Sequence, residues 1–422
     1  MNNKNKTIEN VNLNYIEKNN KNKIMRNIKV DYIYRFLSCF DITSAIWVLY
    51  LGYKGMSLTQ IGLLESIFHI TGFISEIPTG AMADLIGRKR IIVFGRFTAL
   101  ISAVIMLFSN SFIGFVIGFV LSAWGHNMNS GSEEALVYDS LKELNKEDEY
   151  LKINSKLNLI IEIAQGLAVF IGGLLAEKNF DLSYIVAILI GIFALGASMA
   201  FKESSLIESH EKITFIGHFK ECADTLKGNK QLIKILIFFP LIFTFSAIAY
   251  FYGQQYFSDL GFSKSSIALI FLGQSAFSAV GAMYCEKIEY ILRDKTSILI
   301  SVLIGISIVL FGITKGFVSI FVFWILGLFT SILQPISSNK INNLVESKQR
   351  ATIISIDSMF FSLAMILLFP VSGFIAENIS MEIAFVIVGL INLIIVGICG
   401  VYLKRTYSKE VICESEKLEV EK

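Results

Sequence analysis

The sequence lacks the motifs of several common catalytic and energy-coupling sites. No GxxxxGK(S/T) phosphate loop occurs, which argues against an ATP-driven pump, and the four histidines form no HExxH pair. The five cysteines show no CxxC or Cys/His spacing, so we expect neither a metal site nor a disulfide framework. We therefore predict a protein that is not an enzyme and that carries no metal and no cofactor.

Charged side chains are also scarce. They make up 17% of the 422 residues, whereas 54% are hydrophobic, which is more than a water-soluble domain of this length can bury. Lipid must therefore cover the hydrophobic side chains that the folded chain cannot bury. The net charge of +2 gives no reason to expect nucleic acid as a partner. Because residues 1–30 are rich in Asn and Lys and lack an apolar core, they indicate a polar tail rather than a signal peptide.

Twelve segments are long and apolar enough to cross a bilayer as helices, which takes about 20 residues each. They cover residues 32–53, 60–83, 91–108, 112–138, 153–176, 182–201, 232–257, 265–285, 297–313, 318–339, 351–376 and 383–403. With both termini on one side, the opposite loops hold only Lys54, Lys178, Lys264 and Lys315. By the positive-inside rule, both termini are then cytoplasmic. The sequence predicts a multi-pass protein of the plasma or inner membrane.

The longest loop, residues 202–231, is polar and lies near the centre of the chain. It predicts a linker between two six-helix bundles, one over residues 31–201 and the other over 232–403. Residues 1–30 and 404–422 then form cytoplasmic tails. The predicted fold class is an all-α membrane protein with twelve transmembrane helices in two pseudo-repeat bundles.

A weak internal repeat supports this division. The segment GGLLAEKNF at 172–180 resembles SGFIAENIS at 372–380, and the tripeptide GAM at 80–82 returns at 281–283. The two repeats have nearly the same offset. Parallel duplication of a six-helix unit places a solute site between the halves, near the bilayer midplane.

The loop after the second predicted helix reads GAMADLIGRKR. It resembles the loop motif of the major facilitator superfamily, whose Gly, Asp, Gly, Arg and Lys positions it matches. The residues at these positions are Gly80, Asp84, Gly87, Arg88 and Lys89, and Arg90 follows them in the gating motif. With the hydropathy and the duplication, the resemblance covers nearly the whole chain between the tails, and it implies that superfamily's fold and a transport activity.

The charges of this loop predict a gate. Asp84 closes a helix whose carbonyl end is itself negative, so it needs a positive partner. The resemblance implies that this partner is the start of the eleventh helix, near Arg350 and Ala351. Gly87 allows a tight turn, and we expect Arg88 to pair with Asp139. The alternative is that the three basic residues only set topology.

A second contact is expected close to this gate. Glu76 lies one turn before Gly80 and two turns before Asp84. We predict that it works with Asp357 or with nearby backbone donors.

Two features of the proton-coupled drug antiporters of the superfamily are missing. These proteins usually carry an Arg in the fourth helix, whereas residues 120–127 read VLSAWGHN. They also carry a Gly-Pro pair before a double Gly in the fifth helix, where Ala168 and Val169 stand here. The resemblance therefore extends to the superfamily rather than to that branch.

Ionisable side chains within a membrane span are candidates for function, because their burial costs at least about 2.5 kcal/mol. Asp41 and Glu162 lie about 13 Å from the cytoplasmic ends of the first and fifth predicted helices, and His126 about 18 Å into the fourth. All three can titrate in an apolar cavity and bind a proton or a cationic solute. Alternatively, Asp41 hydrogen-bonds Ser38 or Ser44, and His126 only packs beside Trp124. Trp124 and Gln274 complete the candidate solute site.

We therefore expect a secondary transporter that moves a small organic solute by alternating access. Drug-like efflux driven by the proton gradient is the leading hypothesis. A symporter or facilitator for a nutrient or metabolite is the alternative, followed by a membrane sensor that transports nothing. Because one chain supplies both halves of the pathway, we expect a functional monomer in the lipid bilayer.

Overall fold

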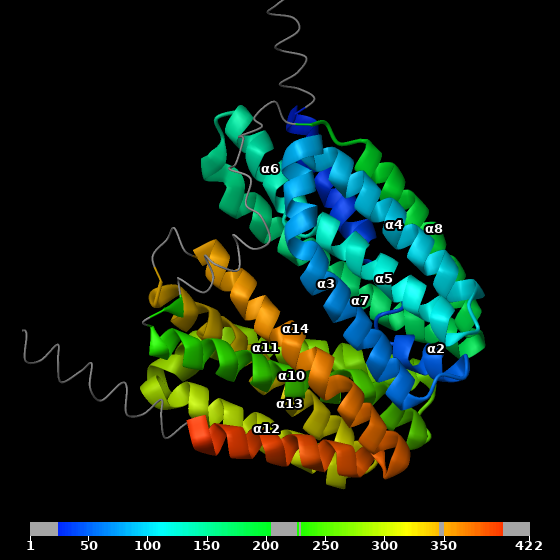
Figure 1. Ribbon diagram of the computed structural model, residues 1–422, viewed down its shortest axis with the longest axis vertical. Helices are drawn as coiled ribbons and strands as arrows, with labels where there is room; N and C mark the ends of the chain where they lie inside the picture. The colour runs from blue at the N-terminus through cyan, green and yellow to red at the C-terminus, as the bar shows by residue number, and fades with distance from the viewer. Residues whose placement is uncertain (1–23, 204–225, 228, 346–349, 400–422) are drawn as a thin grey trace, which may run out of the picture. The chain divides into compact units, whose positions relative to one another are not determined.

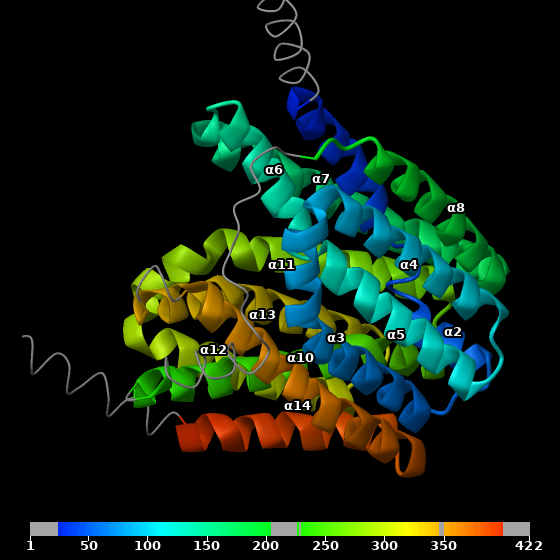
Figure 2. The same cartoon turned by 45° about the horizontal axis from the view of Figure 1, so that its top comes forward.

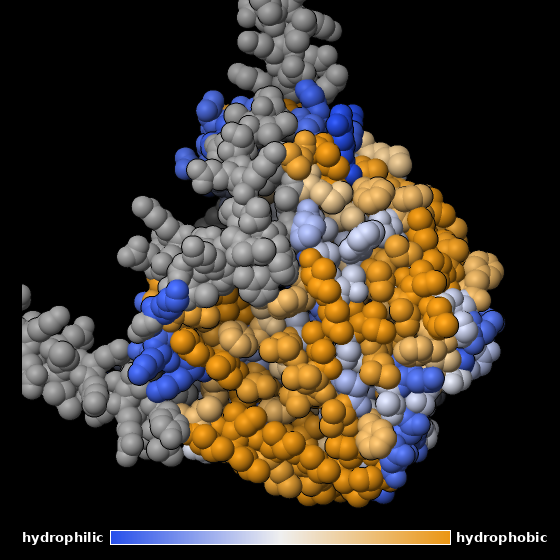
Figure 3. Space-filling view, in the orientation of Figure 1, coloured by the Kyte–Doolittle hydropathy of each residue, from blue (hydrophilic) through white to orange (hydrophobic). Residues whose placement is uncertain are grey.

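The computed structural model describes residues 24–203, 226–227, 229–345 and 350–399. These residues form α-helices, two short 3-10 helices and turns, and no strand occurs among them. In this part of the chain, nine helical segments are long and apolar enough to cross a membrane. Apolar side chains also cover much of the face drawn in Figure 3. The all-helical membrane class is therefore confirmed, and the total of twelve spans stays a prediction.

Contacts between Cα atoms divide the chain into two units. The first comprises residues 1–44 and 74–214, and the second comprises residues 45–73 and 215–422. Helix α3 (Leu58–Ile86) contributes its start to the second unit and its end to the first. The predicted bundle limits, 31–201 and 232–403, stay predictions.

The first unit contains a helix over residues 24–39 and the end of α3. The helices that follow are α4 (Arg88–Phe108), α5 (Phe112–Asn129), α6 (Ser132–Glu143), α7 (Tyr150–Lys178) and α8 (Phe180–Met199), with the 3-10 helix η1 (Glu147–Glu149) before α7. Helix α4 packs along both α5 and α8 (Figure 1). Gly125 makes one of these contacts close, because a Cβ there would lie 2.8 Å from the Gly95 carbonyl.

The second unit contains α2 (Trp47–Tyr53) and the start of α3. The later helices are α10 (Lys230–Asp259), α11 (Lys264–Leu292), α12 (Thr296–Ile313), α13 (Phe317–Asn343), α14 (Arg350–Asn378) and a last helix over residues 381–399, with the 3-10 helix η2 (Arg293–Lys295) before α12. Helix α13 packs on α11 and α12, and α14 packs on α10. The last helix runs beside α12 (Figure 1), and Gly305 of α12 lies against Asn392 of the last helix.

Two predicted spans are interrupted in the structure. The first predicted span, 32–53, ends as a helix at Cys39 and resumes at Trp47 after a turn. The fourth, 112–138, breaks at Ser130 and Gly131, where Gly131 has a φ of 74°. Hydropathy averaged over a window cannot register a break of a few residues, because apolar side chains flank it on both sides.

Candidate functional site

The gating motif forms a sharp turn between two helices. Helix α3 ends at Ile86, Gly87 adopts a φ of 99°, and α4 begins at Arg88. That left-handed φ strongly favours glycine. The Arg88 Nε lies 3.1 Å from the Asp139 Oδ2 on α6, which is the pair expected from the sequence.

The other gate contacts stay predictions. The side chains of Asp84, Arg350 and Ala351 lie outside the described residues. Gly80 is exposed, and a Cβ there would meet nothing within 4 Å in the described structure. Glu76 is exposed in the first unit, while Asp357 is half-buried on α14 of the second.

Glu203, a residue that no sequence motif indicated, holds this turn. Its carboxylate accepts hydrogen bonds from the backbone N–H of Arg88 at 2.8 Å and of Lys89 at 3.0 Å. It thereby satisfies free donors in the first turn of α4, at the positive end of the helix dipole. Burial raises the pKa of Glu203, and the backbone hydrogen bonds oppose that rise. A Cβ at Gly87 would lie 2.6 Å from the Glu203 Oε2, so Gly87 also makes room for the carboxylate.

A buried ion cluster lies in the same unit. Glu133 accepts hydrogen bonds from the hydroxyl of Tyr34 and from the Arg96 Nη2 at 2.8 Å. Its second oxygen lies 2.5 Å from the Arg35 Nη1. Arg35 also lies 3.5 Å from the carboxylate of Asp31. The glutamate thus links the helix over 24–39 to α4 and α6.

The first solute candidate, Asp41, lies in the break of the first predicted span. Its Oδ1 accepts hydrogen bonds from the backbone N–H of Thr43 at 2.9 Å and from the Thr43 hydroxyl at 2.6 Å. The expected partners Ser38 and Ser44 instead donate to backbone carbonyls, those of Arg35 and Asp41. The expectation of a helical Asp41 was wrong, because the helix ends two residues earlier.

Gly172 of α7 lies against this break. A Cβ on Gly172 would lie 1.9 Å from the Ile42 carbonyl oxygen, a separation that no side chain can adopt. Gly172, the first residue of the double glycine in the internal repeat, is therefore required because any side chain there would clash. It brings α7 against the non-helical backbone that carries Asp41.

The remaining candidates lie on several helices. Glu162 on α7 and both Trp124 and His126 on α5 are exposed in the first unit. Gln274 on α11 is half-buried in the second unit and packs against α13, since a Cβ on Gly327 would lie 2.3 Å from its Nε2. This contact gives Gln274 a part in helix packing.

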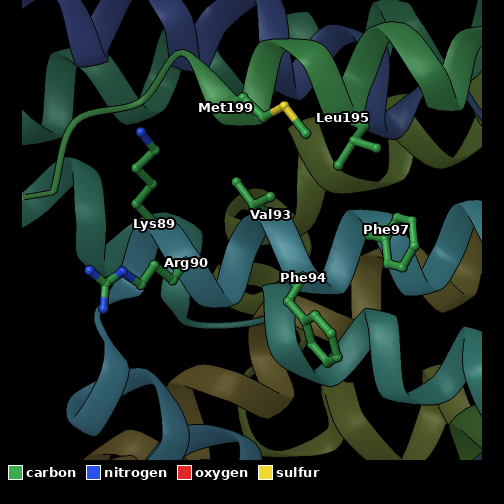
Figure 4. A pocket seen from close by; sticks show the side chains of 7 residues that line it. All are labelled: Lys89, Arg90, Val93, Phe94, Phe97, Leu195 and Met199. Atoms are coloured by element: carbon green, nitrogen blue, oxygen red, sulfur yellow. The ribbon is translucent and has the colours of Figure 1, made fainter.

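A groove of about 390 Å³ lies between α4 and α8 (Figure 4). Its lining residues are Lys89, Arg90, Val93, Phe94, Phe97, Leu195 and Met199. It is apolar except for the two cations of the gating motif at one end. None of the predicted solute residues lines this groove, so we place no solute there.

The start of α3 pairs with the second half of α14 within the second unit (Figures 1 and 2). Both the backbone N–H and the hydroxyl of Thr59 donate to the carboxylate of Glu377, at 3.0 and 2.6 Å. The Ser66 hydroxyl donates to the Ile366 carbonyl at 2.9 Å. That carbonyl lacks its usual helical donor, because the residue four positions later is Pro370. Ser66 therefore fills a hydrogen bond that the proline leaves open.

Close packing accompanies these hydrogen bonds. A Cβ on Gly62 would lie 2.5 Å from the Pro370 Cα, and one on Gly373 would lie 2.4 Å from the Leu58 carbonyl oxygen. The Tyr252 hydroxyl of α10 lies 3.2 Å from the carbonyl oxygens of Leu58 and Phe369. The start of α3 is thus held by α10 and α14 together.

Comparison with known proteins covers most of the chain. The family model described as Major Facilitator Superfamily matches residues 32–213 and 235–418. The MFS-type transporter YxaM of Bacillus subtilis, described as uncharacterised, is 25% identical over 368 residues, covering 84% of this chain and 90% of its own. The quinolone resistance protein NorA of Staphylococcus aureus is 23% identical over 311 residues, covering 71% of this chain and 76% of its own.

Solved structures share the fold at low sequence identity. A crystal structure of a mutant of the nucleoside transporter NupG superposes with a TM-score of 0.76 at 12% identity, covering 90% of this chain and 99% of that one. The POT family transporter PepTSo gives a TM-score of 0.71 at 11% identity, covering 92% and 98%. At these identities the likeness concerns the fold alone.

Proposed function

Because the chain belongs to the major facilitator superfamily, we propose that it is a secondary active transporter that exchanges protons for a small, drug-like organic solute. Transport follows alternating access, and the proton gradient supplies the energy. The solute leaves the cell while protons enter. One chain acts as the functional unit, with both termini in the cytoplasm.

One observation carries this proposal: the first predicted span is broken where Asp41 lies. Non-helical backbone at membrane depth is stable only where protein covers it or where it lines a water-filled cavity. Transporters use such interrupted helices to expose polar groups to a solute. The Asp41 carboxylate is exposed there, and one of its two oxygens accepts both hydrogen bonds from Thr43. The other oxygen is suited to a proton or a cationic solute.

One relative favours efflux, whereas the missing antiporter features argue against the antiporter branch. NorA, described as a quinolone resistance protein, supports drug-like solutes. The fold neighbours, among them a nucleoside transporter and a POT family transporter, share only the fold and do not decide between drug-like solutes and the alternative of a nutrient or metabolite symporter.

Proton release from energised everted vesicles tests the proposal. We expect a fluoroquinolone or a lipophilic cation to dissipate the pH gradient with the wild-type chain and not with Asp41→Asn. Asp148→Asn, an exposed aspartate in η1, is the matched control and should behave as wild type. If only nucleosides or small peptides elicit proton movement, the alternative replaces efflux. If Asp41→Asn retains full proton release, Asp41 is not the coupling group.

A further inference from the structure

Two ionisable residues lie inside the pairing of α3 with α14. The His69 Nε2 lies 3.5 Å from the Glu65 Oε1, one turn earlier on α3. The His69 Nδ1 lies 3.3 Å from the Ser362 hydroxyl on α14. Both side chains are largely buried, with 13% and 12% of their surfaces exposed. His69 lies about 16 Å along α3 from its start, well inside the helix.

The surroundings of the pair are mostly apolar or already engaged. The imidazole packs edge-on against the rings of Phe68 and Phe361. Tyr252 of α10 lies near enough to Glu65 and Glu377 to feel their charges. Its hydroxyl, however, donates to two backbone carbonyls and to neither carboxylate.

The acids on α14 supply no countercharge. Glu377 accepts its hydrogen bonds from Thr59, and Asp357 lies more than one turn before Ser362. Neither is a cation. Among the described side chains of α3, α10 and α14 named above, His69 is the group that can balance the charge of Glu65.

The charge of the pair depends on one proton. With His69 protonated, both ring nitrogens donate, one to Ser362 and one to Glu65, and the pair has no net charge. Without that proton, the pair carries one negative charge in an apolar environment, which is unfavourable unless water reaches it. Water can reach Glu65 when the start of α3 separates from α14. Histidine is the side chain whose charge changes between about pH 5 and pH 8.

We propose that Glu65 and His69 form a proton-binding site whose occupancy keeps α3 paired with α14 and whose loss opens that pairing. The site deepens the proposed proton-coupled transport, on which it rests. The contacts that must break on opening are those of Thr59, Ser66, His69 and the Tyr252 hydroxyl. A proton bound here thus favours the closed form of this pairing.

A distance measurement on the full chain tests the site without any solute. Spin labels on Leu63→Cys and Phe374→Cys, both exposed positions flanking the pairing, report its opening in a background with the five native cysteines replaced. In wild type, raising the pH from about 5 to about 8 should increase the ratio of open to closed molecules by up to about tenfold per pH unit for one proton.

The variants have distinct expected results. His69→Gln should remove the response in this range. Glu65→Gln should invert it, because protonation then leaves an unbalanced positive charge, so that opening increases as the pH falls. Glu382→Gln, on the last helix near Lys315, is the control and should retain the wild-type curve.

The test separates this site from the proposed function. An unchanged pH response in His69→Gln, or a response of unchanged sign in Glu65→Gln, overturns the site even if vesicles release protons. A His69-dependent response in a chain that releases no protons upholds the site and removes the proposed function.

Discussion

The first turns of α3 and the loop that follows its last turn are held by different chemistry. From Leu58 to Ser66, the helix is fixed by hydrogen bonds, among them those of Thr59 to the Glu377 carboxylate, and above all by glycines with no room for a Cβ. After Ile86, the chain is fixed by charge: Arg88 on Asp139, and Glu203 on the backbone of α4. A larger side chain disrupts close packing, whereas removing a charged group disrupts an ion pair or a hydrogen bond to a carboxylate. The two regions should therefore respond to different substitutions.

The largest effect is expected where charge is buried, at Glu133. Glu133→Ala leaves Arg35 and Arg96 without their shared carboxylate, and breaking a buried ion pair typically costs about 3–5 kcal/mol. Thermal unfolding in detergent should show this loss. The neighbouring exposed Glu134→Ala is the control and should change stability by less than about 0.5 kcal/mol. Equal losses in the two variants contradict the cluster's role.

An intermediate effect is expected in the packed region. Gly62→Val places side-chain atoms where the Pro370 backbone lies, and overpacking costs about 1–3 kcal/mol. The same spin-label pair should report an open α3 at every pH. Gly397→Val on the last helix, where a Cβ meets no atom within 4 Å of the described structure, should leave the distance unchanged. If α3 and α14 stay paired in Gly62→Val, Gly62 does not pack closely against Pro370.

The smallest effect is expected at the helix start. Glu203→Ala removes the acceptor for Arg88 and Lys89, and a lost N-terminal cap costs about 1 kcal/mol. The thermal midpoint should fall slightly, and more than in the exposed Glu147→Ala of η1. If the two variants match, the carboxylate does not stabilise the turn.

The sequence predicted the parts that depend on composition and on charge order. Hydropathy located the apolar helices, and the GRKR run located the turn at Gly87 and its pairing with Asp139. It did not reveal the break that holds Asp41, because the flanking residues are as apolar as a continuous helix. Nor did it reveal Gly62 against Pro370 or Glu203 on α4, because these contacts join residues far apart in the chain. The spacing of Glu65 and His69, four residues apart on a membrane helix, was the one local signal that could have identified the pair.

The hydrogen bond between the Ser66 hydroxyl and the carbonyl that Pro370 leaves free links two positions in evolution. The proline frees a carbonyl that the serine then occupies. A descendant that exchanges Pro370 for a residue with a backbone N–H no longer needs the hydroxyl, and one that loses the hydroxyl retains an unsatisfied carbonyl. Selection should therefore act against losing the hydroxyl at 66 while a proline stands at 370, whereas Pro370 can be lost with the hydroxyl still in place.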